Sequence, residues 1–219
     1  GPYATVVFVL PVFVLFFFVL EMFADSLNPF ENIGLNILGL IYIVLPVVLS
    51  IGVVYESVGL NTAYHGLPLL AVIALIWLND VWAYLVGRTI GRNKFFPRLS
   101  PGKTWEGLAG GLVGSIGSAV AIFYVFNEFD TVIFPLVDFI VIAIICSISA
   151  VLGDLIESMF KRSLSVKDTG TLMPGHGGVL DRFDSFFFAI PMVFFYLFVD
   201  RLAEADFVFF PYICHRSKN

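Results

Sequence analysis

The chain has 219 residues, of which 59% are hydrophobic and 13% are charged, and its mean hydropathy is +0.95. A soluble domain carries charge on about one quarter of its residues, so this composition excludes an ordinary soluble protein and indicates an integral membrane protein. The net charge of −5 is modest and nothing resembles a nucleic-acid-binding module, so no nucleic-acid partner is expected.

Apolar runs of about 20 residues fit membrane-spanning helices, whereas strands of a membrane barrel need only about 10 residues. Candidate spans follow in chain order at about residues 3–23, 34–54, 67–87, 105–126, 134–157 and 183–199. We predict an all-α integral membrane protein, with about six transmembrane helices in one polytopic bundle and a single membrane domain over residues 1–219. For the first run a signal peptide is the alternative, but a basic segment and a small-residue cleavage site are absent.

Basic residues separate the loops into two groups. Five lie between the third and fourth predicted spans and four lie between the fifth and sixth, whereas the loops after the second and fourth spans have none. By the positive-inside rule, the two basic loops face the cytoplasm. With six spans both chain ends then face outward, and the linker at residues 24–33 is cytoplasmic although it holds no Lys or Arg.

The fourth predicted span is rich in glycine. Gly107, Gly110, Gly111 and Gly114 form two overlapping small-xxx-small patterns, which let neighbouring helices approach closely. Helix packing is the preferred interpretation, and contact with a ligand is the alternative.

Residues 154–185 concentrate charge in this apolar chain, with five carboxylates, four basic residues, a histidine and four glycines. Charged groups at membrane depth are costly and are retained mainly where they serve a function. Carboxylates can hold a divalent cation, whereas basic side chains and glycine-rich turns suit phosphate. The combination predicts chemistry on a phosphorylated substrate.

Polar residues at helical spacing mark the end of the fifth predicted span. They stand at positions i, i+3, i+4 and i+7 and are Asp154, Glu157, Ser158 and Lys161. Such residues share one helix face, and Asp181 and Asp184 repeat the i, i+3 spacing at the start of the sixth span. Two such helix ends facing each other would suit a magnesium ion. A solvated helix end, with surface ion pairs of roughly 0–1 kcal/mol each, is the alternative.

Three further features suit an anionic ligand. The segment P-G-H-G-G at residues 174–178 can approach a ligand closely and form an anion-binding nest, and His176 is a candidate donor to phosphate, although a generic loop is the alternative. Asp80 lies within the third span, where an acid is a functional-site candidate or part of an ion pair that reaches the interface. Lys103 precedes a predicted helix start that would also attract phosphate, although the P-loop pattern is absent.

These segments together resemble the phosphatidate cytidylyltransferase family, also called CDP-diacylglycerol synthases. The family signature S-x-x-K-R, K-D-x-G, P-G-H-G-G and D-R-x-D appears here at residues 158–162, 167–170, 174–178 and 181–184. N-D-V-W-A-Y-L-V-G-R at residues 79–88 and S-P-G-K-T-W-E-G at residues 100–107 resemble two further family segments. The resemblance covers roughly residues 77–190, which we take as the catalytic region. Met173 and Gly102 depart from the usual pattern, and the chain is shorter than typical members.

The resemblance implies that CTP and phosphatidate react to give CDP-diacylglycerol and pyrophosphate, with Mg²⁺ as cofactor. We assign Asp154 and Asp181 as metal ligands, with Asp168 and Asp184 as further ligands or supports. The candidate catalytic residues are Asp154, Lys161, Arg162, Lys167, Asp168, His176, Asp181, Arg182 and Asp184. The candidate cofactor-binding residues are Ser158, Gly175, Gly177, Gly178, Lys103 and Asp80.

The expected partners are CTP, phosphatidate and the lipid bilayer, and a homodimer is also considered. The expected location is a bacterial inner membrane, with the active site facing the cytoplasm. Alternatives are an enzyme for another lipid phosphate, a transporter with Asp80 and Asp154 on an ion path, or an inactive homologue with a structural role. A transporter would not need the P-G-H-G-G segment beside four basic residues.

Overall fold

The structure is a computed structural model. It describes the backbone of residues 2–24, 27–58, 66–129, 134–166, 169–170 and 178–216, and the side chains of residues 11–24, 27–54, 66–129, 134–166, 169–170 and 178–200. The elements are α1 (Pro2–Phe23), α2 (Pro29–Gly39), the π-helical turn η1 (Leu40–Val44), α3 (Leu45–Val58), α4 (Leu67–Ile90), β1 (Lys94–Phe96), β2 (Ser100–Thr104), α5 (Trp105–Glu128), α6 (Leu136–Ser163) and α7 (Leu180–Arg216).

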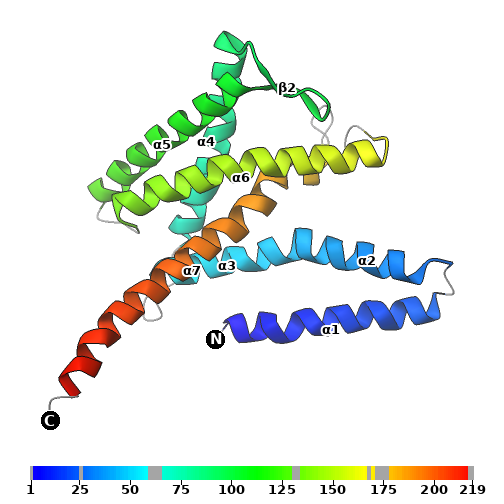
Figure 1. Cartoon of the computed structure of the whole chain (residues 1–219), viewed down its shortest axis with the longest axis horizontal. Helices are drawn as coiled ribbons and strands as arrows, with labels where there is room; N and C mark the ends of the chain where they lie inside the picture. Colours follow the sequence, from blue (N-terminus) through cyan, green and yellow to red (C-terminus); the bar gives the residue numbers. More distant parts are fainter. Residues whose placement is uncertain are drawn as a thin grey trace.

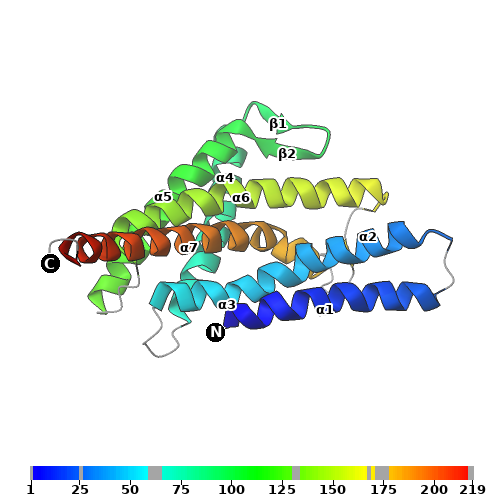
Figure 2. The ribbon, with the colours of Figure 1, turned by 60° about the horizontal axis from the view of Figure 1, so that its bottom comes forward.

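The helices form one polytopic bundle with α6 near its centre (Figure 1). Helices α4 and α5 pack as a pair against one side of α6, and α7 packs against another. Helices α2, η1 and α3 make one continuous rod that packs against α7, and α1 lies along the outer side of this rod (Figure 2). These packing contacts place α4, α5, α6 and the start of α7 around one pocket.

Helices of membrane-spanning length confirm the predicted fold class. Within the described residues, five helices are long and apolar enough to cross a membrane, and they are Pro29–Val54, Leu67–Ile90, Trp105–Glu128, Leu136–Ser163 and Leu180–Asp200. The apolar helix Pro11–Phe23 accounts for the first predicted span. A helix satisfies its own backbone hydrogen bonds, which the interior of a bilayer requires. The protein is therefore an integral membrane protein.

The second span begins earlier than its hydrophobic pattern predicts, at Pro29 in place of residue 34. Proline fits the first turn of a helix, because its missing N–H has no partner there in any case. Glu31 follows in the same turn and complements the positive end of the helix dipole. These polar positions extend the helix beyond the apolar run.

The basic segment between α4 and α5 contains a two-stranded antiparallel hairpin, β1–β2, that the sequence analysis treats as a loop. Its register pairs Lys94 with Thr104 and Phe96 with Ser100. Thr104 also caps α5, because its hydroxyl accepts a hydrogen bond from the Gly107 N–H at 3.1 Å. The hairpin thus joins rigidly to the start of α5 and fixes the position of Lys103 on β2.

Glycines on α5 allow the close packing of α4 against α5, as predicted. A Cβ atom added at Gly110 would collide with the side chain of Val86, and one at Gly114 would collide with Trp82. The buried core continues from this contact through residues of all five spans, including Leu75, Phe139 and Ile190. The core holds α4 and α6 in contact, and residues of both helices line one pocket.

Candidate active site

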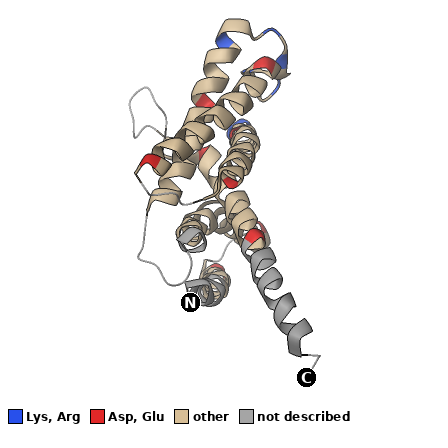
Figure 3. Ribbon diagram, turned by 90° about the vertical axis from the view of Figure 1, so that its left-hand side faces the viewer, with Lys and Arg blue, Asp and Glu red and all other residues tan. Residues whose placement is uncertain are grey.

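A pocket of about 580 Å³ opens at the end of the bundle where the hairpin lies. This volume is within the range of roughly 300–1,000 Å³ that is usual for small-molecule sites. Figure 3 shows that many of the described Lys and Arg residues gather around the hairpin end. The polar and charged lining residues are Asn79, Asp80, Tyr84, Arg88, Ser100, Lys103, Thr104, Asp154, Glu157, Lys161, Asp181, Asp184 and Ser185.

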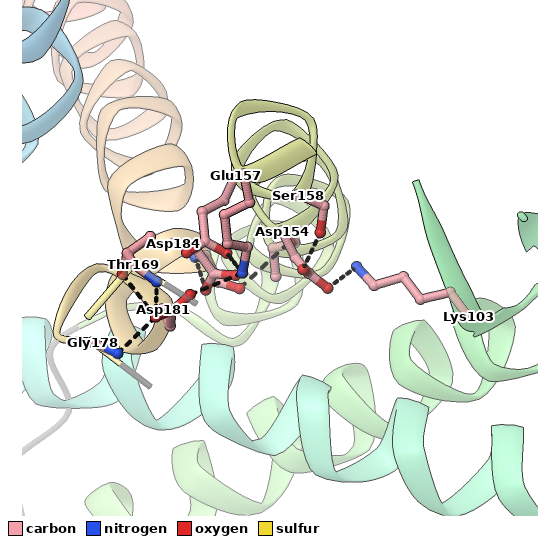
Figure 4. Close-up of polar contacts among 11 residues, drawn as sticks. Lys103, Asp154, Glu157, Ser158, Thr169, Gly178, Asp181 and Asp184 are labelled. Carbon is pink, nitrogen blue, oxygen red and sulfur yellow. Dashed lines mark hydrogen bonds and ion pairs between the residues drawn. The ribbon is translucent and has the colours of Figure 1, made fainter. Parts of the chain in front are cut away.

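Three carboxyl groups converge on the wall that α6 and α7 form. Oxygen atoms of Asp154, Glu157 and Asp184 lie within 4.8 Å of one another, and Figure 4 shows their side chains pointing together. Asp154 and Glu157 share a face of α6 because they are three residues apart. Asp184 comes from the first turns of α7. We call these three residues the carboxylate cluster.

Gly153 allows α7 to approach α6 closely enough to complete the cluster. A Cβ atom added at Gly153 would lie 2.6 Å from the carbonyl oxygen of Asp184 and 3.2 Å from Cα of Ser185. Real Cβ atoms do not approach backbone atoms so closely, so only glycine permits this contact. The position of Asp184 beside Asp154 therefore depends on Gly153.

We expect Gly153→Ala to destabilise the protein by about 1–3 kcal/mol, the usual cost of forcing an extra carbon into a packed contact. Thermal unfolding in detergent measures the effect. Gly117→Ala on α5 is the matched control, because a Cβ atom there meets no atom within 4 Å. Alanine is favoured over glycine in a helix by about 1 kcal/mol, so the control should be neutral or slightly stabilised. Equal stability of the two variants would contradict the proposed contact.

The carboxylate cluster has the chemistry of a divalent-cation site. Glu157 is buried, and its Oε1 atom has no hydrogen-bond partner within the described residues. A buried carboxylate oxygen without a partner is costly, and three carboxylates at this separation repel one another. Oxygen ligands of this type are those that Mg²⁺ and Ca²⁺ prefer. The cluster therefore fits a divalent cation.

Two lysines balance part of the negative charge. Lys103 on β2 places its Nζ atom 2.5 Å from Oδ2 of Asp154, an ion pair that joins the hairpin to α6. Lys161 lies between two carboxylates, with Nζ 2.7 Å from Glu157 Oε2 and 2.9 Å from Asp181 Oδ1. Both ammonium groups line the pocket and lie where an anionic ligand would meet them.

Both carboxylate oxygens of Asp181 accept hydrogen bonds. Its Oδ1 accepts from Lys161, and its Oδ2 accepts from the Thr169 N–H at 2.9 Å, the Thr169 hydroxyl at 2.7 Å and the Gly178 N–H at 2.7 Å. Thr169 and Gly178 stand at the two ends of the segment that contains the P-G-H-G-G motif. Asp181 therefore holds both ends of this segment at the start of α7 (Figure 4).

The remaining predicted site residues fall into three groups: some lie at the pocket, some are exposed, and some lie outside the described residues. Asp80 lines the pocket, and the Asn79 amide donates to its Oδ1 at 3.5 Å. The Ser158 hydroxyl donates to Asp154 Oδ1 at 3.3 Å. Arg162 and Arg182 are exposed, and neither is among the pocket-lining residues that the structure describes. The predictions for Lys167, Asp168, Gly175, His176 and Gly177 lie outside the described residues.

Several pocket residues are absent from the sequence-based assignment. The helical stripe on α6 includes Glu157, but its spacing alone does not mark Glu157 as a metal ligand. Tyr84 and Arg88 follow Asp80 at i+4 and i+8, so all three share one face of α4, and Arg88 donates to the Tyr84 hydroxyl at 2.9 Å. This spacing was a signal that could have placed them in the pocket. Phe95 also lines the pocket, and nothing in its local sequence indicates this.

The fold and the pocket define an integral membrane protein with a partly buried acidic site and nearby lysine ammonium groups, suited to a metal ion and a phosphorylated ligand. A model of the cytidylyltransferase family matches residues 2–200. The chain belongs to this family.

Individual relatives carry a more specific name. A phosphatidate cytidylyltransferase of Haemophilus influenzae is 46% identical over 142 residues, which are 62% of this chain and 48% of the relative. One of Staphylococcus saprophyticus is 45% identical over 119 residues, 54% of this chain and 44% of the relative. One of Staphylococcus aureus is 42% identical over 146 residues, 64% of this chain and 55% of the relative. The matches span about half the length of these relatives.

Proposed function

We propose that this protein transfers the cytidylyl group of CTP to phosphatidate, giving CDP-diacylglycerol and pyrophosphate. The observation that carries the proposal is the carboxylate cluster beside Lys103 and Lys161 in one pocket. The family match and the names of the relatives support the choice of reaction. Residues 77–190 would supply most of the catalytic region.

The proposed reaction is an in-line displacement at phosphorus. A phosphate oxygen of phosphatidate attacks the α-phosphorus of CTP, a new P–O bond forms, and the bond to the β-phosphate breaks to release pyrophosphate. The attacking phosphate is already anionic, so the reaction needs no strong general base. The protein must instead position two anions and reduce their repulsion.

Asp154, Glu157 and Asp184 would hold a divalent cation, for which we propose Mg²⁺. When bound, such an ion neutralises phosphate charge and polarises the reacting phosphoryl group. Lys103 and Lys161 would bind phosphate oxygens by charge-assisted hydrogen bonds. We assign Asp181 to the positioning of Lys161 and of the P-G-H-G-G segment, because donors already occupy both of its oxygens.

The proposed setting is a bacterial inner membrane with the pocket on the cytoplasmic side. The basic hairpin segment and the basic end of α6 meet at this pocket, as the pair Lys103–Asp154 and the position of Lys161 show. Basic segments remain on the cytoplasmic side of a membrane. CTP would enter from water, and phosphatidate would enter from the adjacent leaflet.

Labelled CTP, phosphatidate and Mg²⁺ added to the purified protein in detergent test the proposal. We expect label in the lipid fraction only when phosphatidate and the metal are both present, because the lipid is the nucleophile and the cation offsets phosphate charge. Addition of EDTA should abolish the product. A parallel reaction with a different lipid phosphate tests the alternative substrate class. An unlabelled lipid fraction in every reaction would show that the protein is not this enzyme.

A further inference from the structure

Tyr42 occupies an irregular position in the second span. It lies in η1, the π-helical turn Leu40–Val44 that interrupts the rod of α2 and α3. Its ring centroid lies 5.7 Å from that of Phe160 on α6, 5.7 Å from Phe187 and 6.3 Å from Phe188 on α7. Single π-helical turns inside α-helices are frequent at functional sites.

Helical spacing places this aromatic contact next to the carboxylate cluster. Phe160 is three residues after Glu157 on α6, and Phe187 and Phe188 are three and four residues after Asp184 on α7. Residues three or four apart on a helix are neighbours on one face. The Tyr42 ring therefore contacts aromatic side chains that lie one helical turn beyond Glu157 and Asp184.

Three buried side-chain oxygen atoms lack hydrogen-bond partners within the described residues, and one of them is Oδ1 of Asn79. The other two are the hydroxyl of Tyr42 and Oε1 of Glu157. Buried polar groups in proteins are nearly always hydrogen-bonded. The two groups are complementary, because a tyrosine hydroxyl can donate and a carboxylate can only accept.

We propose that Tyr42 is a positioning residue for the cation site. Its hydroxyl donates a hydrogen bond to Oε1 of Glu157, directly or through one water molecule, when the carboxylate cluster holds a divalent cation. Such outer partners orient a ligating carboxylate and strengthen metal binding. The inference rests on the cation site of the proposed function. It extends the functional region beyond residues 77–190 into the second span.

Direct measurement of Mn²⁺ binding by electron paramagnetic resonance on the purified, detergent-solubilised protein tests this role. Tyr42→Phe removes only the hydroxyl and keeps the ring against Phe160. We expect the variant to bind Mn²⁺ about 10-fold more weakly, the lower end of the usual effect of removing an outer partner. Tyr124→Phe, at an exposed tyrosine on α5, is the matched control and should bind as the parent does.

A double-mutant cycle with Glu157→Gln separates positioning from a general structural effect. If Tyr42 acts through Glu157, Tyr42→Phe should have little further effect on Mn²⁺ affinity in the Glu157→Gln background. Unchanged affinity of Tyr42→Phe, or additive losses in the double variant, would overturn the inference. Loss of thermal stability in Tyr42→Phe with unchanged Mn²⁺ affinity would also overturn it, since the hydroxyl would then be only structural.

The outcomes distinguish this inference from the proposed function. Mn²⁺ binding that depends on Tyr42, in a protein that makes no lipid product from CTP, would support the inference and reject the proposed reaction. If the protein forms the lipid product and Tyr42→Phe binds Mn²⁺ as the parent does, the proposed reaction is supported and the inference is rejected.

Discussion

Asp154→Asn should lower the turnover of CTP to lipid product by about 10²–10³-fold or more, comparable to the loss of a group that stabilises charge in a transition state. The substitution keeps the size of the side chain and removes its charge. It thereby takes one oxygen ligand from the carboxylate cluster and the counterion from Lys103. The measurement is the initial rate of label transfer from CTP to phosphatidate.

Glu128→Gln is the matched control for this loss of charge. Glu128 is an exposed carboxylate at the far end of α5, so its variant should retain the parent rate. Asp154→Asn should also bind Mn²⁺ more weakly while its thermal unfolding stays close to that of the parent. A rate within about threefold of the parent would mean that Asp154 is not part of the reacting site.

Asp181→Asn should also reduce turnover by about 100-fold or more, but for a different reason. The amide cannot accept all of the hydrogen bonds from Thr169 and Gly178, and it is no longer a counterion for Lys161. Hydrogen bonds to a charged group contribute about 1.5–3 kcal/mol each. Hydrogen exchange at the Thr169 and Gly178 amides should therefore become at least about 10-fold faster, as measured by mass spectrometry.

Mn²⁺ affinity distinguishes the two roles considered for Asp181. If Asp181 positions Lys161 and the P-G-H-G-G segment, Asp181→Asn should bind Mn²⁺ within about threefold of the parent. If Asp181 is a direct metal ligand, as the sequence analysis predicts, the affinity should fall about as far as in Asp154→Asn. A loss of Mn²⁺ affinity as large as that in Asp154→Asn, with unchanged hydrogen exchange at the Thr169 amide, would contradict the positioning role that the hydrogen bonds assign to Asp181.

The proposed location of the site follows from evidence that is local in the chain. Charges in an apolar sequence identify where function lies, and the i, i+3 spacing of Asp154 and Glu157 places both on one face of α6. The spans were predictable for a similar reason, since a run of apolar residues long enough to cross a bilayer forms a helix. The start at Pro29 and the hairpin β1–β2 were missed, because neither depends on hydrophobicity.

The choice of partners among the charged residues was not predictable from spacing. Asp181 and Asp184 have the same spacing as Asp154 and Glu157, yet Asp184 joins the cluster and Asp181 binds Lys161, Thr169 and Gly178. The rotation of α7 about its axis and its contact at Gly153 decide between them. Those quantities depend on the packing of residues that are distant in sequence.

The sequence alone determined that this is a membrane protein of the cytidylyltransferase family, and it predicted a candidate site between residues 154 and 185. Composition, helical periodicity and the signature motifs are properties of neighbouring residues, so they can be read without a fold. Only the tertiary structure decided that Glu157 completes the carboxylate cluster, that Lys103 reaches Asp154 from the hairpin, and that Tyr42 approaches from the second span. Each of these contacts depends on the angles at which the helices cross, and side-chain packing across the whole bundle sets those angles.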